Sequence, residues 1–406
     1  MDKPELLCPA GDSECLAAAL QYGADAVYLG AKMFGMRAAA KNFDMAELKS
    51  AVDTAHAQNV KVYLTVNVLP RNRELDAFPS FLRDVQACGV DAVIAADLGV
   101  ITKIRALAPD LPVHASTQTG VVNYETANAL WNLGCERVVL ARELSVEEIA
   151  EIRAKSPSEL ELEAFVHGAM CMSISGRCLL SEYFTGRDAN RGACAQSCRW
   201  KYALMEEKRP NQFFPIGEDE NGSYILNAKD LCMAEHLETL ANAGISSFKI
   251  EGRAKAAYYV AGVTNAYRMA VDALFDEPKT DVPAWVFEEL ENVSHRPYTT
   301  GFYFGQPTDS IHNATASYVR NYDVVGIVQG CGQGRLMVSQ RNRFFAGDTL
   351  EILMPKAKPV PIVVTDLQNA DGEVINSANH AVMDCSMAYT GEKVPNGAFL
   401  RKKFDE

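Results

Sequence analysis

The chain has 406 residues, of which 48% are apolar and 22% are charged, and its formal net charge is −13 at pH 7. This composition argues against a disordered chain and leaves room for a large core and a small second domain. No run of 18 uncharged apolar residues and no leader segment are present, so we expect a cytoplasmic protein without membrane contacts. The acidic balance argues against general nucleic-acid binding, but the part from Ala316 onward has ten basic and ten acidic residues and could still meet a polyanion.

Eight buried β-type runs alternate with eight helical runs along the first 275 residues. Strands are predicted at 5–8, 25–30, 61–67, 91–96, 112–116, 136–141, 161–166 and 246–250. Helices are predicted at 13–22, 45–58, 74–87, 98–108, 123–133, 146–155, 231–243 and 255–274. Glycines such as Gly23 and Gly89 end a helix just before the next strand. This order favours a (β/α)8 barrel; an open doubly wound sheet is the alternative, weakened because no G-x-G-x-x-G follows the first strand.

The seventh and eighth predicted strands are about 80 residues apart, far more than one helix needs. We therefore predict a catalytic barrel over residues 1–275 with a cysteine-rich insertion at 168–230, on the face where barrels carry active sites. A connector follows at 276–314, with a helical stretch at 285–294. Residues 315–406 read as a small antiparallel β-barrel, with short β-type runs at Asp323–Val328, Arg335–Val338, Asp348–Ile352, Pro361–Asp366 and His380–Asp384.

The cysteines carry the strongest chemical signal. There are eleven, an odd number in a chain without an export signal, which argues against a disulfide framework. Four of them form the pattern C-x6-C-x15-C-x3-C, at Cys171, Cys178, Cys194 and Cys198. Four thiolates suit tetrahedral zinc or a 4Fe–4S cluster. The six-residue gap and the place at the barrel mouth favour the cluster, while structural zinc and a metal-free set of thiols remain alternatives.

Several motifs resemble the signature of the U32 "peptidase" family. The most specific are Glu163-x-Phe165-x-His167-Gly168-Ala169-Met170-Cys171 and Gly176-Arg177-Cys178-Leu179-Leu180-Ser181. Further matches are Glu5-Leu6-Leu7-x-Pro9-Ala10-Gly11, Gly23-Ala24-Asp25-Ala26-Val27-Tyr28, Ser247-Phe248-Lys249-Ile250-Glu251-Gly252-Arg253 and His295-Arg296-x-Tyr298-Thr299-x-Gly301-Phe302. Within the family, the sequence is most similar to the prephenate-dependent tRNA uridine hydroxylases, including a C-terminal β module like that of translation factors.

The resemblance implies an enzyme that hydroxylates wobble uridine 34 in the anticodon stem-loop of tRNA to 5-hydroxyuridine. It also implies prephenate as co-substrate, no need for molecular oxygen, and a 4Fe–4S cluster that air would remove or replace by zinc. By motif, the cluster ligands would be Cys171, Cys178, Cys194 and Cys198. Cys232, at the start of a predicted helix, is the reserve ligand, because in some quinone-hydroxylating relatives the fourth ligand comes from a later position.

A prephenate pocket needs cationic side chains, since prephenate carries two carboxylates. The candidates at the predicted barrel mouth are Arg37, Arg142, His167, Lys249 and Arg253. Hydrogen-bond donors could be Ser116 and Gln118, and proton carriers could be Asp97 and Glu143. Each has a plainer alternative role: a salt bridge at the rim for an arginine, or a place in the core for the histidine.

RNA contacts would come from basic side chains interleaved with aromatic ones. Candidates near the cysteines are Arg187, Arg191, Arg199, Lys201 and Trp200, while Arg341, Arg343 and the run Arg401-Lys402-Lys403 could hold the tRNA body. The alternatives are a U32-type, collagenase-like peptidase, a hydroxylase of ribosomal RNA or of a quinone precursor, and a zinc-stabilised RNA-binding protein. The peptidase lacks support because neither H-E-x-x-H nor G-x-S-x-G occurs. A homodimer or a paralogous partner subunit stays open.

Overall fold

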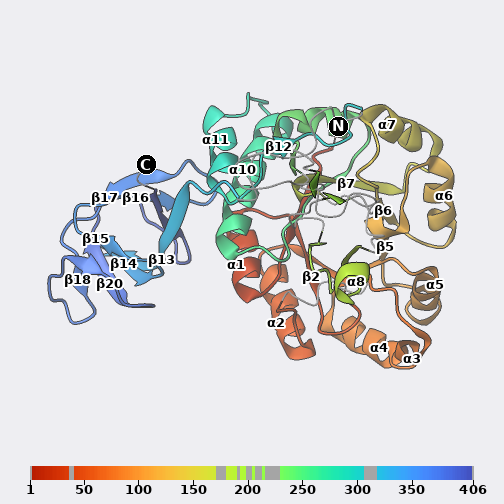
Figure 1. Cartoon of the computed structure of the whole chain (residues 1–406), viewed down its shortest axis with the longest axis horizontal. Coiled ribbons are helices and arrows are strands. Elements are labelled where there is room, and N and C mark those ends of the chain that lie inside the picture. The colour runs from red at the N-terminus through yellow and green to blue at the C-terminus, as the bar shows by residue number, and fades with distance from the viewer. Residues whose placement is uncertain are drawn as a thin grey trace.

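The computed structural model describes residues 2–35, 41–170, 180–189, 193–197, 204–205, 213–214, 229–305 and 318–404. Within these ranges, eight parallel strands form a closed barrel (Figure 1). They are β1 (Glu5–Pro9), β2 (Ala26–Gly30), β3 (Lys61–Val66), β4 (Ala92–Ala95), β5 (Val113–Ala115), β6 (Arg137–Val139), β7 (Glu161–Ala169) and β11 (Ser247–Ile250). The sheet closes because β11 pairs in parallel with both β1 and β7. The (β/α)8 barrel expected from the alternating pattern is confirmed.

Helices surround the barrel (Figure 1). They are α1 (Ser13–Tyr22), α2 (Met45–His56), α3 (Asn72–Leu75), α4 (Phe78–Cys88), α5 (Leu98–Leu107), α6 (Tyr124–Asn132), α7 (Val146–Lys155), α9 (Leu237–Asn242) and α10 (Ala257–Phe275). Their starts are fixed locally: Asp44 and Ser145 each form a capping box with a glutamate three residues later. Gly23 and Gly89 end α1 and α4 with φ of 103° and 79°, which is the role their sequence positions predict.

Two helix predictions need correction. The predicted helix at 74–87 is two helices, because α4 starts afresh at Phe78 with Pro79 in its first turn. The predicted helix at 231–243 begins as a strand, β10 (Asp230–Cys232), which pairs antiparallel with the end of β7 before η4 (Ala234–His236) and α9 follow. Leu231 and Met233 are both buried, and this spacing of two is the period of a strand, whereas a helix buries residues three or four apart.

Short elements complete the barrel face and the connection to the C-terminal part. They are η1 (Thr117–Thr119), α8 (Leu180–Thr185), β8 (Leu204–Met205), β9 (Phe213–Phe214), α11 (Ala284–Asn292) and β12 (Tyr298–Thr299). β12 pairs in parallel with β10, so the connection adds a further strand beside the barrel wall. Helix α11 coincides with the helical stretch predicted near 285–294. None of the helices in the described ranges is long and apolar enough to cross a membrane.

The C-terminal module is an antiparallel sheet with its own core. Its strands are β13 (Tyr322–Gly332), β14 (Arg335–Gln340), β16 (Thr349–Leu353), β17 (Val360–Val363), β18 (Gln368–Asn369), β20 (Asp384–Ala388) and β21 (Phe399–Lys403), beside a small sheet of β15 (Phe344–Phe345) and β19 (Ser377–Ala378). Val328, Leu336 and Leu400 are buried between them. The run predicted at His380–Asp384 is wrong: it is a turn, with Val382 at φ 59°, and the strand begins at Asp384.

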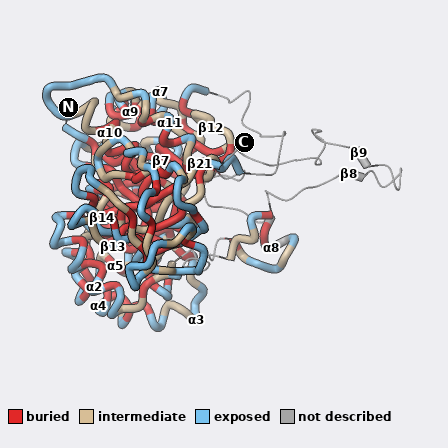
Figure 2. Tube along the Cα trace, turned by 90° about the vertical axis from the view of Figure 1, so that its left-hand side faces the viewer, coloured by how far each residue is buried: buried red, intermediate tan, exposed pale blue. Residues whose placement is uncertain are grey.

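The module is docked on the barrel side that carries α1, α10 and α11 (Figure 1). Arg401 of β21 is 1% exposed and donates to both carboxylate oxygens of Glu289 on α11, at 2.6 and 2.8 Å. Tyr22 of α1 donates to the carbonyl oxygen of Leu353, and the Lys356 N–H donates to Asn265 of α10. Figure 2 shows the buried residues in the middle of the molecule, with exposed residues along its outer turns.

Candidate active site

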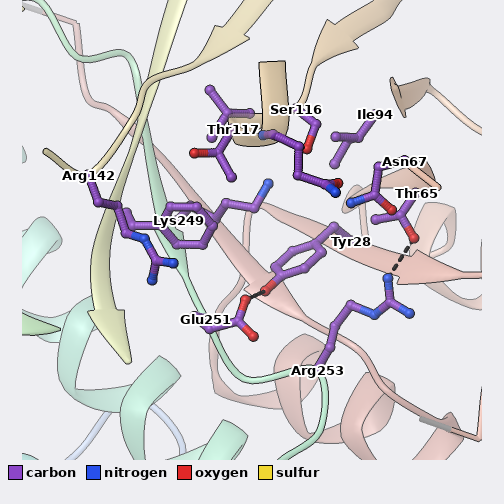
Figure 3. A pocket seen from close by; sticks show the side chains of 13 residues that line it. Tyr28, Thr65, Asn67, Ile94, Ser116, Thr117, Arg142, Lys249, Glu251 and Arg253 are labelled. Atoms are coloured by element: carbon purple, nitrogen blue, oxygen red, sulfur yellow. Dashed lines mark hydrogen bonds between the residues drawn. The ribbon is translucent and has the colours of Figure 1, made fainter. Parts of the chain in front are cut away.

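A pocket opens at the carboxyl ends of the barrel strands (Figure 3). Its lining comes from the ends of β2 to β7 and of β11. The lining residues are Tyr28, Thr65, Asn67, Ile94, Ser116, Thr117, Gln118, Val139, Arg142, Phe165, Lys249, Glu251 and Arg253. Active sites of (β/α)8 barrels lie at this face, because residues from many strands converge there.

Three cationic side chains of the lining are buried and held by neighbours. Arg142 donates to the carbonyl oxygen of Ala169 at 2.7 Å, and its guanidinium carbon lies 5.0 Å from the centre of the Phe165 ring. Lys249 Nζ donates to Glu163 at 2.6 Å and lies 4.5 Å from the centre of the Tyr28 ring. The pocket therefore presents fixed positive charge, which suits an anionic ligand.

Arg253 has the most tightly fitted surroundings of the three. Its guanidinium donates to Thr65 Oγ1 at 2.6 Å and to Asn42 Oδ1 at 2.9 Å. A Cβ atom at Gly30 would lie 2.5 Å from Nη2 of Arg253, and one at Gly11 would lie 2.1 Å from its carbonyl oxygen. These two glycines are thus explained by the space that Arg253 occupies.

Polar groups complete the lining. Ser116 and Gln118 both lie in the pocket wall, where the Ser116 side chain accepts from the Gln118 N–H and starts η1. Tyr28 donates to the carbonyl oxygen of Ile250 at 2.9 Å, and its hydroxyl lies 3.3 Å from Glu251 (Figure 3). Hydroxyl, amide and carboxyl groups therefore face the same space as the three cations.

His167 was expected at this mouth, but it lies behind the barrel wall and is not among the lining residues. Counting by twos along β7 from Glu163 and Phe165 puts His167 on the inner face. The pairing with β11 shifts register between Lys249 and Ile250, so β7 has one extra residue and His167 turns outward. There Nδ1 lies 3.3 Å from the Tyr267 hydroxyl, and burial, with smaller effects of His295 and Lys255, lowers the pKa of His167 to about 3.

Two more of the predicted substrate residues, Asp97 and Glu143, are not among the described residues that line the pocket. Asp97 caps α5 by accepting from the Val100 N–H at 2.9 Å, so its place has a structural reason. Glu143 is half-buried on the loop after β6. Arg37 lies outside the described residues.

The described part of the chain includes one of the four predicted cluster ligands, Cys194, and the reserve ligand Cys232. Cys194 is half-buried, its Sγ accepts from the Gln196 N–H at 3.4 Å, and the adjoining Ala195 N–H donates to Ser181. Cys171, Cys178 and Cys198 lie outside the described residues. Among the residues that the structure describes, no group of three His, Cys, Asp or Glu side chains is arranged to hold a metal.

Cys232 lies in β10 and not at a helix start, as the sequence had suggested. It is paired across the strands with His167, and its Sγ lies 3.8 Å from the Tyr267 hydroxyl. Burial raises the pKa of the Cys232 thiol to about 11. The side chain also lines a second depression, formed with residues of η4, α11 and β12.

The predicted RNA-contacting residues lie in two places. Arg187 is exposed just after α8, while Arg191, Arg199, Trp200 and Lys201 lie outside the described residues. Arg341 and Arg343 are exposed on the C-terminal module, and the Arg343 guanidinium lies 5.2 Å from the centre of the Phe345 ring. Arg401 is not available to a partner, because it is buried against Glu289.

Sequence reasoning missed several pocket residues. Thr65, Asn67 and Glu251 were not singled out, and neither was Glu163, which is buried beneath the pocket. The sequence does contain a usable signal. In a buried parallel strand every second side chain faces the barrel interior, so a polar residue at one of these positions is a candidate for the site. Tyr28 and Thr65 occupy such positions near the ends of β2 and β3.

Comparison with known proteins shows the family to which the chain belongs. The model of peptidase family U32 matches residues 11–313, and that of the family's C-terminal domain matches residues 320–401. The tRNA hydroxylation protein P of Escherichia coli K12 is 37% identical, over 92% of this chain and 91% of that protein. The tRNA hydroxylation protein P1 of Bacillus subtilis 168 is 38% identical, over 93% and 90%. A solved U32 peptidase is 16% identical, with a TM-score of 0.42 over 62% of this chain and 94% of that one. With both parts of the family matched in order along nearly its whole length, the chain belongs to peptidase family U32.

Proposed function

We propose that the chain is a tRNA-modifying enzyme that hydroxylates C5 of uridine 34, without molecular oxygen, with prephenate as co-substrate. The observation that carries this proposal is the pocket at the carboxyl end of the barrel, in which Arg142, Lys249 and Arg253 converge. It is supported by the names of the two relatives from Escherichia coli and Bacillus subtilis, which match nine-tenths of the chain.

The pocket has the chemistry for prephenate, because it combines cationic side chains with an apolar wall. Two carboxylates would find guanidinium and ammonium partners, which bind carboxylates by charge-assisted hydrogen bonds. The ring would lie against the apolar and aromatic part of the lining, formed by Ile94, Val139 and Phe165.

The proposal includes a 4Fe–4S cluster held by Cys171, Cys178, Cys194 and Cys198, with Cys232 in reserve. Thiolates are the ligands that such clusters take, and the half-buried Sγ of Cys194 fits that use. Arg142, a pocket residue, donates to the carbonyl oxygen of Ala169, and Cys171, the first of the four cysteines, follows two residues later in the sequence. When bound, the cluster would supply electron transfer or a Lewis acid; the residues of the pocket would bind and orient the co-substrate and limit its contact with water.

The tRNA would be held by basic and aromatic side chains on two parts of the chain. Arg187, Arg191, Arg199, Lys201 and Trp200 belong to the insertion near the barrel mouth, and Arg341 and Arg343 to the C-terminal module. In the described part, Arg343 stacked on the exposed ring of Phe345 is a pairing that suits contact with phosphate and with unpaired bases.

The pocket favours hydroxylation over peptide hydrolysis. A serine or cysteine peptidase needs a base, most often histidine, within reach of its nucleophile. Of the described residues that line the pocket, Ser116 has a hydroxyl, but none is a histidine or a cysteine. His167, the nearest candidate by sequence, is on the outer side of the wall.

The test starts with protein purified without oxygen. A broad absorbance band near 400 nm with about four irons per chain is expected for the cluster. Anaerobic reaction with tRNA and prephenate should then yield 5-hydroxyuridine at position 34, detected by mass spectrometry of nuclease digests. Colourless protein with one zinc would contradict the cluster. Product in ribosomal RNA or a quinone precursor, with none in tRNA, would support the sister activities instead, and cleavage of a collagen-type peptide would support the peptidase.

A further inference from the structure

Below the pocket, four charged side chains form an ion-pair column through the inside of the barrel: Lys249, Glu163, Arg137 and Glu5. Lys249 Nζ lies 2.6 Å from Oε1 of Glu163, and Oε2 of Glu163 lies 3.1 Å from Arg137. Arg137 also donates to Glu5 at 2.6 Å. Lys249 lines the pocket, whereas Arg137 lines a depression at the opposite end of the barrel, so the column connects the two ends.

Stability does not explain this arrangement. The interior of a (β/α)8 barrel is normally filled by branched apolar side chains. Burying charges carries a large desolvation cost, and apolar residues of similar volume often give equal or greater stability than a buried pair. Glu163 is fully buried, and Arg137 and Lys249 are each only 4% exposed. Such a column at a pocket therefore indicates a role in the site.

Glu163 is the residue that determines where the lysine charge lies. Its two oxygens are divided between two cations, one to Lys249 and the other to Arg137. A lysine side chain is flexible, and holding its ammonium before a ligand arrives removes an entropic cost of binding. The Tyr28 ring restricts the position of the Lys249 ammonium from another side, because Nζ lies 4.5 Å from the ring centre (Figure 3).

We propose that Glu163 is a positioning residue, which is held by Arg137 and fixes the Lys249 ammonium at the pocket floor as the binding charge for a carboxylate. The inference rests on the proposed function, because it takes this pocket as the prephenate site. It assigns a role to Glu163, which does not line the pocket, and it gives a reason for the buried charges inside the barrel.

The chain offers a matched control two residues away on the same strand. Glu161 also accepts from Arg137, at 2.6 Å, but its side chain is 49% exposed and it pairs with Arg137, not with Lys249. Titration calorimetry with prephenate, together with KM and kcat for tRNA hydroxylation, should separate the two glutamates. Glu163→Gln should raise the Kd and KM for prephenate about tenfold to a hundredfold with little change in kcat, whereas Glu161→Gln should leave them unchanged.

A double-mutant cycle then tests whether Glu163 acts through Lys249. Glu163→Gln should weaken prephenate binding in the natural chain but have no further effect when Lys249→Gln is already present. The double variant leaves no lone buried charge at the pair, so the comparison of Lys249→Gln with the double variant remains available if Glu163→Gln alone fails to fold.

Three outcomes would contradict the inference in different ways. A lowered Tm with unchanged prephenate binding in Glu163→Gln would make Glu163 a purely structural residue. Additive losses in the cycle would mean that it acts independently of Lys249. A natural chain that does not bind prephenate at all would overturn the proposed co-substrate, and the wild-type titration shows this before any variant is made.

Discussion

The inside of the barrel has two unlike halves. On the side of β1 to β4, an apolar cluster fills the space, formed by Leu7, Ala26, Tyr28, Tyr63, Ala92 and Ile94. On the side of β6, β7 and β11, the same space holds Arg137, Glu163 and Lys249 of the ion-pair column, which reaches β1 only at its far end, at Glu5. Leu7 and Lys249 are paired residues of neighbouring strands, so the boundary between the halves runs between them. The difference teaches that one barrel can use some strands to gain stability and others to prepare a charged site.

The largest expected effect lies in the apolar half. Leu7→Ala removes a fully buried side chain from a closely packed interior, so we expect the free energy of unfolding to fall by about 2–5 kcal/mol. Urea unfolding measures this loss, and kcat/KM for prephenate at low temperature should change little. A variant as stable as the natural chain would mean that this cluster does not carry the stability that the comparison assigns to it.

In the charged half, activity should fall as well. Lys249→Met keeps the side-chain volume and removes the charge, so kcat/KM for prephenate should fall about a hundredfold at a temperature where the variant stays folded. Lys61→Met is the control, because Lys61 is an exposed lysine at the other end of the barrel interior. If Lys249→Met keeps the natural kcat/KM, the charged half of the interior does not serve to bind prephenate.

A smaller effect is expected when the pocket is altered without removing a charge. In Gly30→Ala the new methyl group would lie 2.5 Å from Arg253 Nη2 and 2.9 Å from Asn42 Oδ1, so the guanidinium has to move. We expect KM for prephenate to rise about tenfold, the effect of a weakened charge-assisted hydrogen bond. Gly332→Ala, where no atom lies within 4 Å of the added Cβ, should leave KM unchanged. Equal KM values in both variants would argue that Arg253 does not contact the substrate.

The fold of the barrel was predictable because its signals are local. Gly23, Gly89, Gly134 and Gly244 all have positive φ and precede buried strands, so these four helix-to-strand joints are visible in the sequence. Strand β21 was not predicted, because its formation depends on a residue far away in the sequence. Its run of basic residues reads as a solvated tail, but Arg401 is buried because Glu289, more than a hundred residues away, neutralises it.

The site was predictable only as far as strand ends could be located. Arg142, Lys249, Arg253, Ser116 and Gln118 follow or end predicted strands, and all five line the pocket. His167 is also near the end of a predicted strand, but its side chain faces away from the pocket. The cause is a bulge, which depends on the pairing between two strands and not on either sequence alone. The partnership of Glu163 with Arg137 also joins neighbouring strands, so it required the fold.

The smallest expected effect concerns the far end of the ion-pair column. Burial raises the pKa of the Glu5 carboxyl, but the charge and hydrogen bonds of Arg137, with bonds from Tyr63 and Ser247, outweigh it and leave the pKa below 4.5. A carboxyl with a lowered folded-state pKa contributes stability above its unfolded pKa and loses that contribution as the pH falls. The free energy of unfolding of Glu5→Gln should therefore fall less steeply than that of the natural chain from about pH 5 to about pH 3, as measured by urea unfolding. Glu14→Gln, at the exposed start of α1, should keep the natural slope. If Glu5→Gln keeps it as well, Arg137 does not hold Glu5 in solution, and the column ends at Arg137; if the slope decreases, the charged half of the interior extends through the whole barrel.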